Sequence, residues 1–144
     1  MRRAFTKLES APLRKATLIS AYRQLLKNKK IKRNEQLEKL LVKGAIRTLS
    51  GVTVITLLTK PFTCPGKCVF CPTEPNMPKS YLSNEPAAQR AVRNRFDPYK
   101  QVQKRIEALE TNGHEVDKIE IIILGGTWSV YPASYQNSFI RQIY

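Results

Sequence analysis

The chain has 144 residues, enough for one domain with its own core, and at 42% hydrophobic and 8% aromatic it is not composed like a disordered protein. No apolar run of signal-peptide length follows the first residues, and nothing approaches the roughly 18 consecutive apolar residues of a membrane span, so we expect a cytoplasmic protein without membrane contact. The formal net charge of +14 is concentrated in the first third of the chain, which indicates a segment that binds a polyanion such as nucleic acid, although a well-solvated basic surface would have the same composition.

This basic segment, residues 1–50, holds 14 Lys and Arg against 3 Asp and Glu and is predicted to form two helices. Pro12 suits the first turn of a helix that continues to about Leu26. Asn34 suits the N-cap of a second helix, whose leucines repeat at helical spacing until Gly51 ends it. Neither helix carries enough apolar side chains to build a core, so we interpret the basic segment as an appendage to the rest of the chain.

The rest of the chain, residues 51–144, alternates between strand and helix signals. The predicted elements are a buried strand at 52–58, a proline-rich loop at 59–84, helices at 84–95 and 97–113, a second buried strand at 116–124 and a helix from about 132. This order predicts a parallel βαβ unit and an α/β fold. Two strands leave unpaired edges, a complete α/β barrel needs about 250 residues, and the last helix shows no stop signal, so we expect a truncated TIM-like barrel.

All three cysteines, Cys64, Cys68 and Cys71, lie in the 59–84 loop, and a loop of this length is usually functional. An odd number of clustered cysteines makes a poor disulfide framework and is more typical of metal ligands or catalytic thiols. The CxxxCxxC spacing allows three thiolates to hold three irons of a four-iron cluster, which leaves the fourth iron for a small molecule. A zinc site would need a fourth ligand, and His114, about fifty residues downstream, is predicted to be a cap or surface residue. Cysteines without any metal are the remaining alternative.

This cysteine spacing resembles the signature of the radical S-adenosylmethionine superfamily. Phe70 matches the residue that lies against the adenine in that superfamily. Gly125, Gly126 and Thr127, at the end of the second predicted strand, resemble the motif that binds the methionine amino group, and we expect Gly126 to need a close backbone approach or a positive φ. A Gly-Gly pair alone often marks an ordinary turn. The resemblance implies a 4Fe-4S cluster that cleaves S-adenosylmethionine to a 5′-deoxyadenosyl radical, in a partial radical S-adenosylmethionine (TIM-like) barrel.

Residues 52–144 also resemble one family within that superfamily, the catalytic subunit of Elongator (Elongator protein 3) with its bacterial and archaeal relatives. The matching stretches are 68–72, 80–81, 85–86, 90–91, 93, 95–99, 113–114, 116–118, 120 and 125–127.

The resemblance to the Elongator protein 3 family implies a transferase that adds a carboxymethyl group to carbon 5 of the tRNA wobble uridine. Acetyl-CoA would be the donor, and the other partners would be tRNA, an electron donor and either complex subunits or a second copy. Lys118 falls on the family lysine that contacts acetyl-CoA, although a solvated lysine at a strand start would look the same. Residues 1–50 then correspond to a tRNA-binding region and residues 51–144 to the first part of the barrel, so we expect no complete reaction from this chain alone.

Two other functions remain open. One is a different radical S-adenosylmethionine enzyme, such as a methylthiotransferase or a porphyrin enzyme, but those usually lack a basic two-helix front end joined to an Asp-Pro-Tyr helix break. The other is a nonenzymatic zinc-dependent RNA-binding module, which metal analysis would distinguish.

Overall fold

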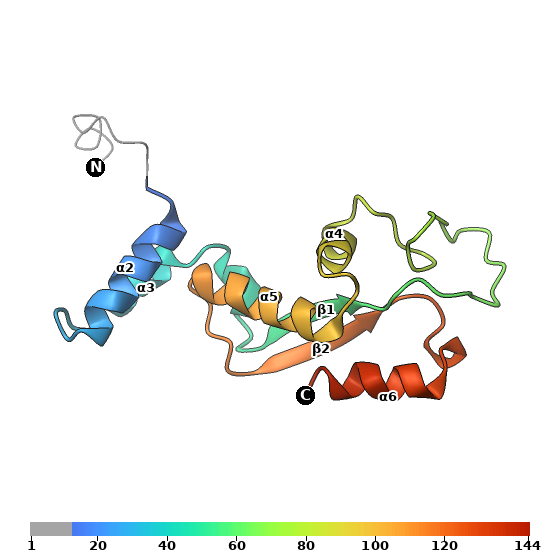
Figure 1. The fold of residues 1–144 in the computed structure, drawn as a ribbon. Helices are drawn as coiled ribbons and strands as arrows, with labels where there is room; N and C mark the ends of the chain where they lie inside the picture. The colour runs from blue at the N-terminus through green and yellow to red at the C-terminus, as the bar shows by residue number, and fades with distance from the viewer. Residues whose placement is uncertain (1–12) are drawn as a thin grey trace.

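The computed structural model describes residues 13–144, which form a mixed helix and strand fold around a small parallel sheet (Figure 1). Strand β1 (Thr53–Leu58) pairs with β2 (Ile119–Leu124) in a register that sets Thr53 opposite Ile119 and Leu58 opposite Leu124. The chain crosses from β1 to β2 through helices α4 (Pro86–Arg93) and α5 (Pro98–Thr111). The predicted βαβ unit and α/β class are therefore confirmed. The sheet of the described residues has two strands, so the barrel stays a prediction.

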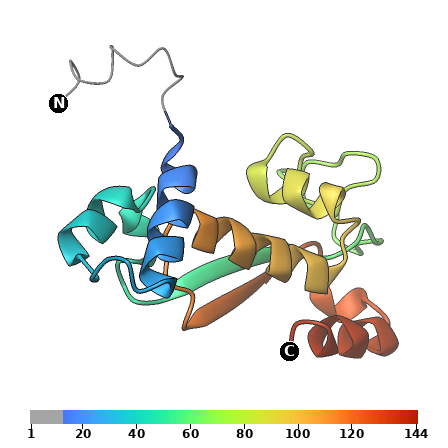
Figure 2. The same ribbon diagram turned by 60° about the vertical axis from the view of Figure 1, so that its left-hand side comes forward.

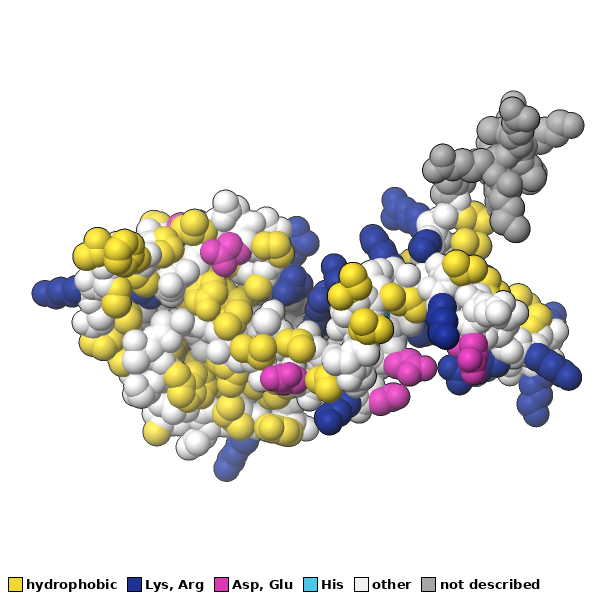
Figure 3. All heavy atoms as spheres, turned by 180° about the vertical axis from the view of Figure 1, so that it is seen from behind, with side chains coloured by type: hydrophobic (Ala, Val, Ile, Leu, Met, Phe, Trp, Pro, Cys, Tyr) yellow, Lys and Arg dark blue, Asp and Glu magenta, His cyan; other side chains and the backbone are white. Residues whose placement is uncertain are grey.

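Apolar side chains cover the two faces of the sheet unequally. One buried cluster lies toward α5 and α6 (Ala133–Arg141), and another lies toward α4; their buried members are Ile55, Leu57, Leu109 and Phe139 in the first, and Leu58, Met77, Ala88 and Ala91 in the second. The second cluster covers the sheet only at its carboxyl end, so Val54 stays 42% exposed and Ile122 38% exposed. Apolar side chains accordingly show on the surface of the sheet region seen from behind (Figure 3). The prediction that the second strand is buried was wrong, because β2 has no buried residue.

Two of the predicted helix caps are confirmed in atomic detail. Asn34 Oδ1 accepts a hydrogen bond from Leu37 N at 3.0 Å and starts α3 (Glu35–Leu41). Asp97 Oδ1 accepts one from Lys100 N at 2.9 Å and starts α5. The first predicted helix is α2 (Lys15–Lys27), and its proposed first-turn residue Pro12 lies outside the described residues.

The second basic helix is shorter than predicted, because it ends at Leu41 instead of continuing to Gly51. Gly44 then takes a left-handed φ of +73° before the short 3-10 turn η1 (Ala45–Thr48). The backbone between these elements bonds to the turn after α5: Lys43 N donates to Asn112 O at 3.0 Å, and His114 Nε2 lies 3.0 Å from Lys43 O. These tertiary hydrogen bonds replace the helical ones that the leucine spacing predicts.

Of the two roles expected for His114, cap or surface residue, the structure excludes the second, since His114 is 2% exposed, and its backbone N donates to Leu109 O at 3.1 Å at the end of α5. Its other ring nitrogen, Nδ1, lies 3.0 Å from Thr48 Oγ1. Arg23 adds a bond from α2 to the same region, with Nη1 donating to Glu110 O at 2.8 Å. Helix α2 consequently lies between α3 and the carboxyl end of α5 and contacts both (Figure 2). At the other end of the chain, α6 stops at Arg141, short of the predicted continuation.

Candidate functional site

The candidate site lies where β1 and β2 end. The cysteine loop (residues 59–84) leaves the carboxyl end of β1, and the glycine turn (residues 125–127) leaves the carboxyl end of β2 (Figure 1). Ligands of open parallel sheets bind at this edge. Cys64 Sγ lies 3.3 Å from Thr127 Oγ1, and a Cβ added to Gly126 would lie 3.9 Å from Cys64 Cβ. The structure thus brings Cys64, Gly126 and Thr127 together.

The two glycines of the turn have different steric requirements. A Cβ on Gly125 would overlap Thr59 Oγ1 and lie 3.3 Å from Thr59 Cβ, so this glycine allows a close approach between the strand ends. A Cβ on Gly126 would meet Lys79 Cβ at 3.5 Å, an ordinary contact, and its φ is not in the positive range. The expected positive φ at Gly126 was therefore wrong. Within this protein it is Gly125 that has no room for a side chain.

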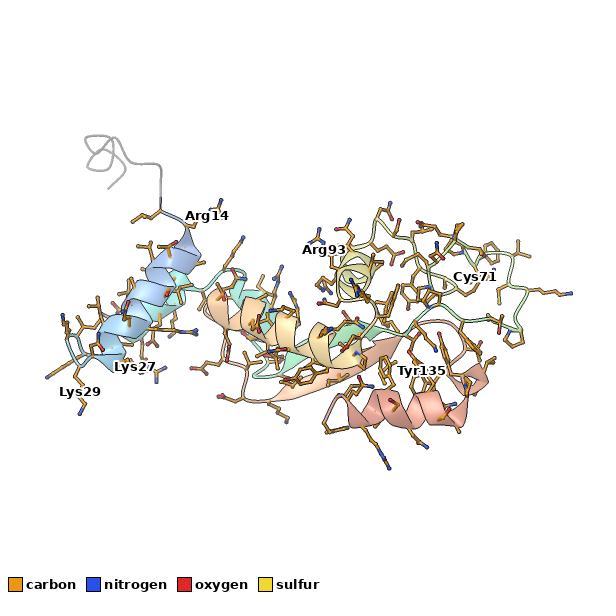
Figure 4. The ribbon with its side chains drawn as sticks, viewed as in Figure 1. Arg14, Lys27, Lys29, Cys71, Arg93 and Tyr135 are labelled. Atoms are coloured by element: carbon orange, nitrogen blue, oxygen red, sulfur yellow. The ribbon has the colours of Figure 1, made fainter. Side chains whose placement is uncertain are left out.

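Cys68 is exposed, Cys64 and Cys71 are half-buried, and none of the three is in a disulfide. The sulfurs of Cys64 and Cys68 flank Gly66, where a Cβ would lie 3.5 Å from one and 3.6 Å from the other. Cys71 N donates to Cys68 O at 3.2 Å, and Figure 4 shows Cys71 on the same loop. Within residues 13–144 no three metal-ligating side chains are gathered as a closed site. Three thiols on one loop are nevertheless the donor set that iron–sulfur clusters use, so these residues fit such a group chemically.

Cys64 differs from an ordinary thiol in its acidity. The hydrogen bond from the Thr127 hydroxyl lowers the pKa of Cys64, with help from the backbone of Gly66 and the charge of Lys79. A lower pKa raises the thiolate fraction at neutral pH, and the thiolate is the form that binds metals and attacks electrophiles. The glycine turn therefore contributes directly to the chemistry of the cysteine loop.

The hydroxyl of Tyr131 holds the first residues of the cysteine loop, a role that no sequence motif indicated. Thr59 Oγ1 lies 2.8 Å from Tyr131 Oη, which donates to Lys60 O at 2.8 Å. Lys60 N in turn donates to Tyr135 Oη at 3.1 Å, and the Tyr131 and Tyr135 rings stack with centroids 5.0 Å apart. Tyr131 is 4% exposed, and burial raises the pKa of its hydroxyl. Two tyrosines at helical spacing just after the glycine turn were the available signal.

Two predicted site residues are not near this network. Phe70, on the cysteine loop, is 98% exposed, so the described residues do not bury it against a ligand site. Lys118 is exposed at the amino end of β2, where its carbonyl accepts a hydrogen bond from Thr53 N at 2.8 Å. His114 lies at that same end with both ring nitrogens engaged, and therefore it does not complete a zinc site with the cysteines.

Known proteins similar to this chain are tRNA-modifying enzymes and Elongator subunits by name, while no family model matches it. The tRNA uridine(34) acetyltransferase of Dehalococcoides mccartyi is 44% identical over 103 residues, which cover 72% of this chain and 22% of the relative. The enzyme of that name from Methanocaldococcus infernus is 46% identical over 109 residues, covering 72% and 20%. Elongator complex protein 3 of Homo sapiens is 41% identical over 110 residues, covering 69% and 20%. The chain spans about a fifth of the length of these relatives.

Proposed function

Because the chain belongs to the family of Elongator protein 3 and the tRNA uridine(34) acetyltransferases, we propose that it takes part in modifying the wobble uridine of tRNA. The observation that carries the proposal is the meeting of Cys64 with Thr127 at the carboxyl edge of a parallel sheet. Parallel α/β folds bind their ligands at this edge. The names of the relatives favour uridine modification over a methylthiotransferase or a zinc-dependent RNA-binding module.

Under this proposal Cys64, Cys68 and Cys71 hold a 4Fe-4S cluster, while the glycine turn (Gly125, Gly126 and Thr127) and Phe70 hold S-adenosylmethionine. When bound, the cluster would supply the electron and S-adenosylmethionine the source of the radical, which is the chemistry this site would offer. The hydrogen bond of the Thr127 hydroxyl lowers the pKa of Cys64, which favours the thiolate form that ligation needs.

The proposal places the two substrates on other parts of the chain. Lys118 contacts acetyl-CoA, the carboxymethyl donor, since a lysine ammonium is a compact charge suited to phosphates. The basic segment (residues 1–50) binds tRNA, and Figure 4 shows its side chains Arg14, Lys27 and Lys29 at the ends of α2, where all three are exposed. An electron donor and partner subunits complete the system, with residues 51–144 as the first part of a radical barrel.

Anaerobic reconstitution with iron and sulfide tests the metal assignment, with iron and zinc counted by elemental analysis. We expect about four irons per chain and a brown chromophore. Replacing Cys64, Cys68 and Cys71 together by Ala should abolish both, whereas Lys67→Ala, between the first two cysteines, should keep them. Stoichiometric zinc with no iron uptake would replace the radical assignment by the zinc-dependent RNA-binding module.

A further inference from the structure

Three arginines from three elements converge on β1. Arg47 lies in η1, Arg90 in α4 and Arg105 in α5, and each of these elements packs against β1. Arg90 reaches the middle of the strand, where its Nη2 donates to Thr56 Oγ1 at 3.3 Å. The three guanidinium groups are close enough for their charges to repel one another. We call this group the arginine cluster.

Arg105 places one side of the arginine cluster next to the edge of β1 that β2 does not pair with. Gln101 identifies this edge, because its Oε1 accepts from Leu58 N and its Nε2 donates to Leu58 O, both at 3.0 Å. The N–H and C=O groups of one strand residue point to the same side of the strand, and those of the next residue point to the opposite side. Because Thr59 N donates to Leu124 O, the backbone groups of Thr59 point toward β2. Those of the preceding residue, Leu58, therefore point away from β2. Arg105 follows Gln101 by four residues on α5 and shares its helix face.

The described residues give the arginine cluster no acidic partner. The ion pairs of residues 13–144 are Arg33–Glu38, Arg33–Glu115, Lys100–Asp97 and Lys104–Glu107. Burial and mutual repulsion both lower the pKa of Arg90 and Arg105. Because arginine stays protonated at any ordinary pH, this repulsion persists until an anion binds.

We propose that Arg47, Arg90 and Arg105 bind a phosphate of the RNA backbone. Guanidinium groups bind phosphate through paired, charge-assisted hydrogen bonds. A phosphate between the three groups would also offset the repulsion among their positive charges. The net charge of +14 favours a polyanion as the source of that phosphate. The inference rests on the proposed function in taking tRNA as this polyanion. A different role for the cluster would be to prevent strand pairing at an open edge, as charged side chains often do.

The test compares two single substitutions on α4 in the whole chain. Arg90→Gln removes a member of the cluster, and Arg93→Gln is the matched control, since Arg93 is exposed on the same helix and loses the same charge (Figure 4). The dissociation constant for unmodified tRNA is measured across a range of salt concentrations. We expect Arg90→Gln to weaken binding roughly tenfold and to reduce the salt slope by about 1, and Arg93→Gln to change both only slightly.

The outcomes separate this inference from the proposed function. Equal effects of Arg90→Gln and Arg93→Gln would mean diffuse electrostatic attraction and would overturn the arginine cluster as a site, with the proposed function intact. Unchanged tRNA affinity together with new self-association would assign the cluster to edge protection. Loss of acetyl-CoA binding with tRNA affinity retained would assign it to the donor instead. A wild-type chain that does not bind tRNA would overturn both proposals. If Arg90→Gln fails to fold by circular dichroism, Arg105→Gln takes its place.

Discussion

Replacing Gly125 by Ala should destabilise the protein because the close approach between the two strand ends has no room for a side chain. The new methyl group would overlap Thr59 Oγ1, and Thr59 is 1% exposed with that oxygen held 2.8 Å from Tyr131 Oη. Overpacking of this kind costs about 1–3 kcal/mol, and loss of the buried hydrogen bond adds about 1–3 kcal/mol. We therefore expect the free energy of unfolding to fall by about 3 kcal/mol.

Urea unfolding followed by the fluorescence of Trp128, the single tryptophan, measures this change, since its ring lies 5.7 Å from that of Phe139. Gly126→Ala is the control and should stay within about 1 kcal/mol of wild type, because its Cβ would make only ordinary contacts. In a Thr59→Ala background the cost of Gly125→Ala should shrink by at least about 1 kcal/mol, as expected for contacting residues. Equal costs for the two glycines, or no coupling to Thr59, would refute the steric argument.

Two further predictions concern Cys64 and Lys118. Thr127→Val should raise the pKa of Cys64, because it removes the hydroxyl that hydrogen-bonds to the thiol. Alkylation of Cys64 by iodoacetamide, measured by mass spectrometry as a function of pH, should then shift to higher pH. Cys68, which has no hydrogen bond with Thr127, serves as the internal control. An unshifted alkylation profile of Cys64 would show that Thr127 does not lower the pKa of this thiol. Lys118→Ala should weaken acetyl-CoA binding and leave cluster content and 5′-deoxyadenosine formation largely unchanged; normal donor binding by the variant would return Lys118 to the solvated surface.

The elements that the sequence predicted well are those that local chemistry specifies. Asn34 and Asp97 cap helices through bonds to residues three positions away, so their spacing along the chain was sufficient evidence. The end of α3 depends instead on Lys43 bonding to Asn112, about seventy residues away, which no periodicity reveals. The exposure of Ile122 likewise depends on how far α4 extends over the sheet, which is a property of packing and not of the strand.

In the candidate site, too, short motifs were predictable from the sequence, and contacts between residues far apart in the chain were not. The cysteine spacing and the glycine pair are local motifs that can be read from the sequence, whereas the contact between Cys64 and Thr127 is found only in the structure. The contribution of Tyr131 depends on Thr59 and Lys60, which are about seventy residues earlier in the chain, so its role follows only from the parallel pairing of the strands. The same pairing explains why glycine is required at Gly125, where the two strand ends converge.

The geometry of the sheet also constrains how a donor at Lys118 would serve radical chemistry at Cys64. These residues lie at opposite ends of six-residue strands, and at about 3.3 Å per residue the ends are about 20 Å apart. A small acetyl group cannot contact both residues. The donor would therefore extend along the sheet, with its phosphates near Lys118 and its acetyl end near the cysteine loop. If Lys118 binds the donor as proposed, its ammonium group therefore contacts the phosphates and not the reacting carbon. Loss of Lys118 should therefore weaken binding of free coenzyme A as much as it weakens binding of acetyl-CoA.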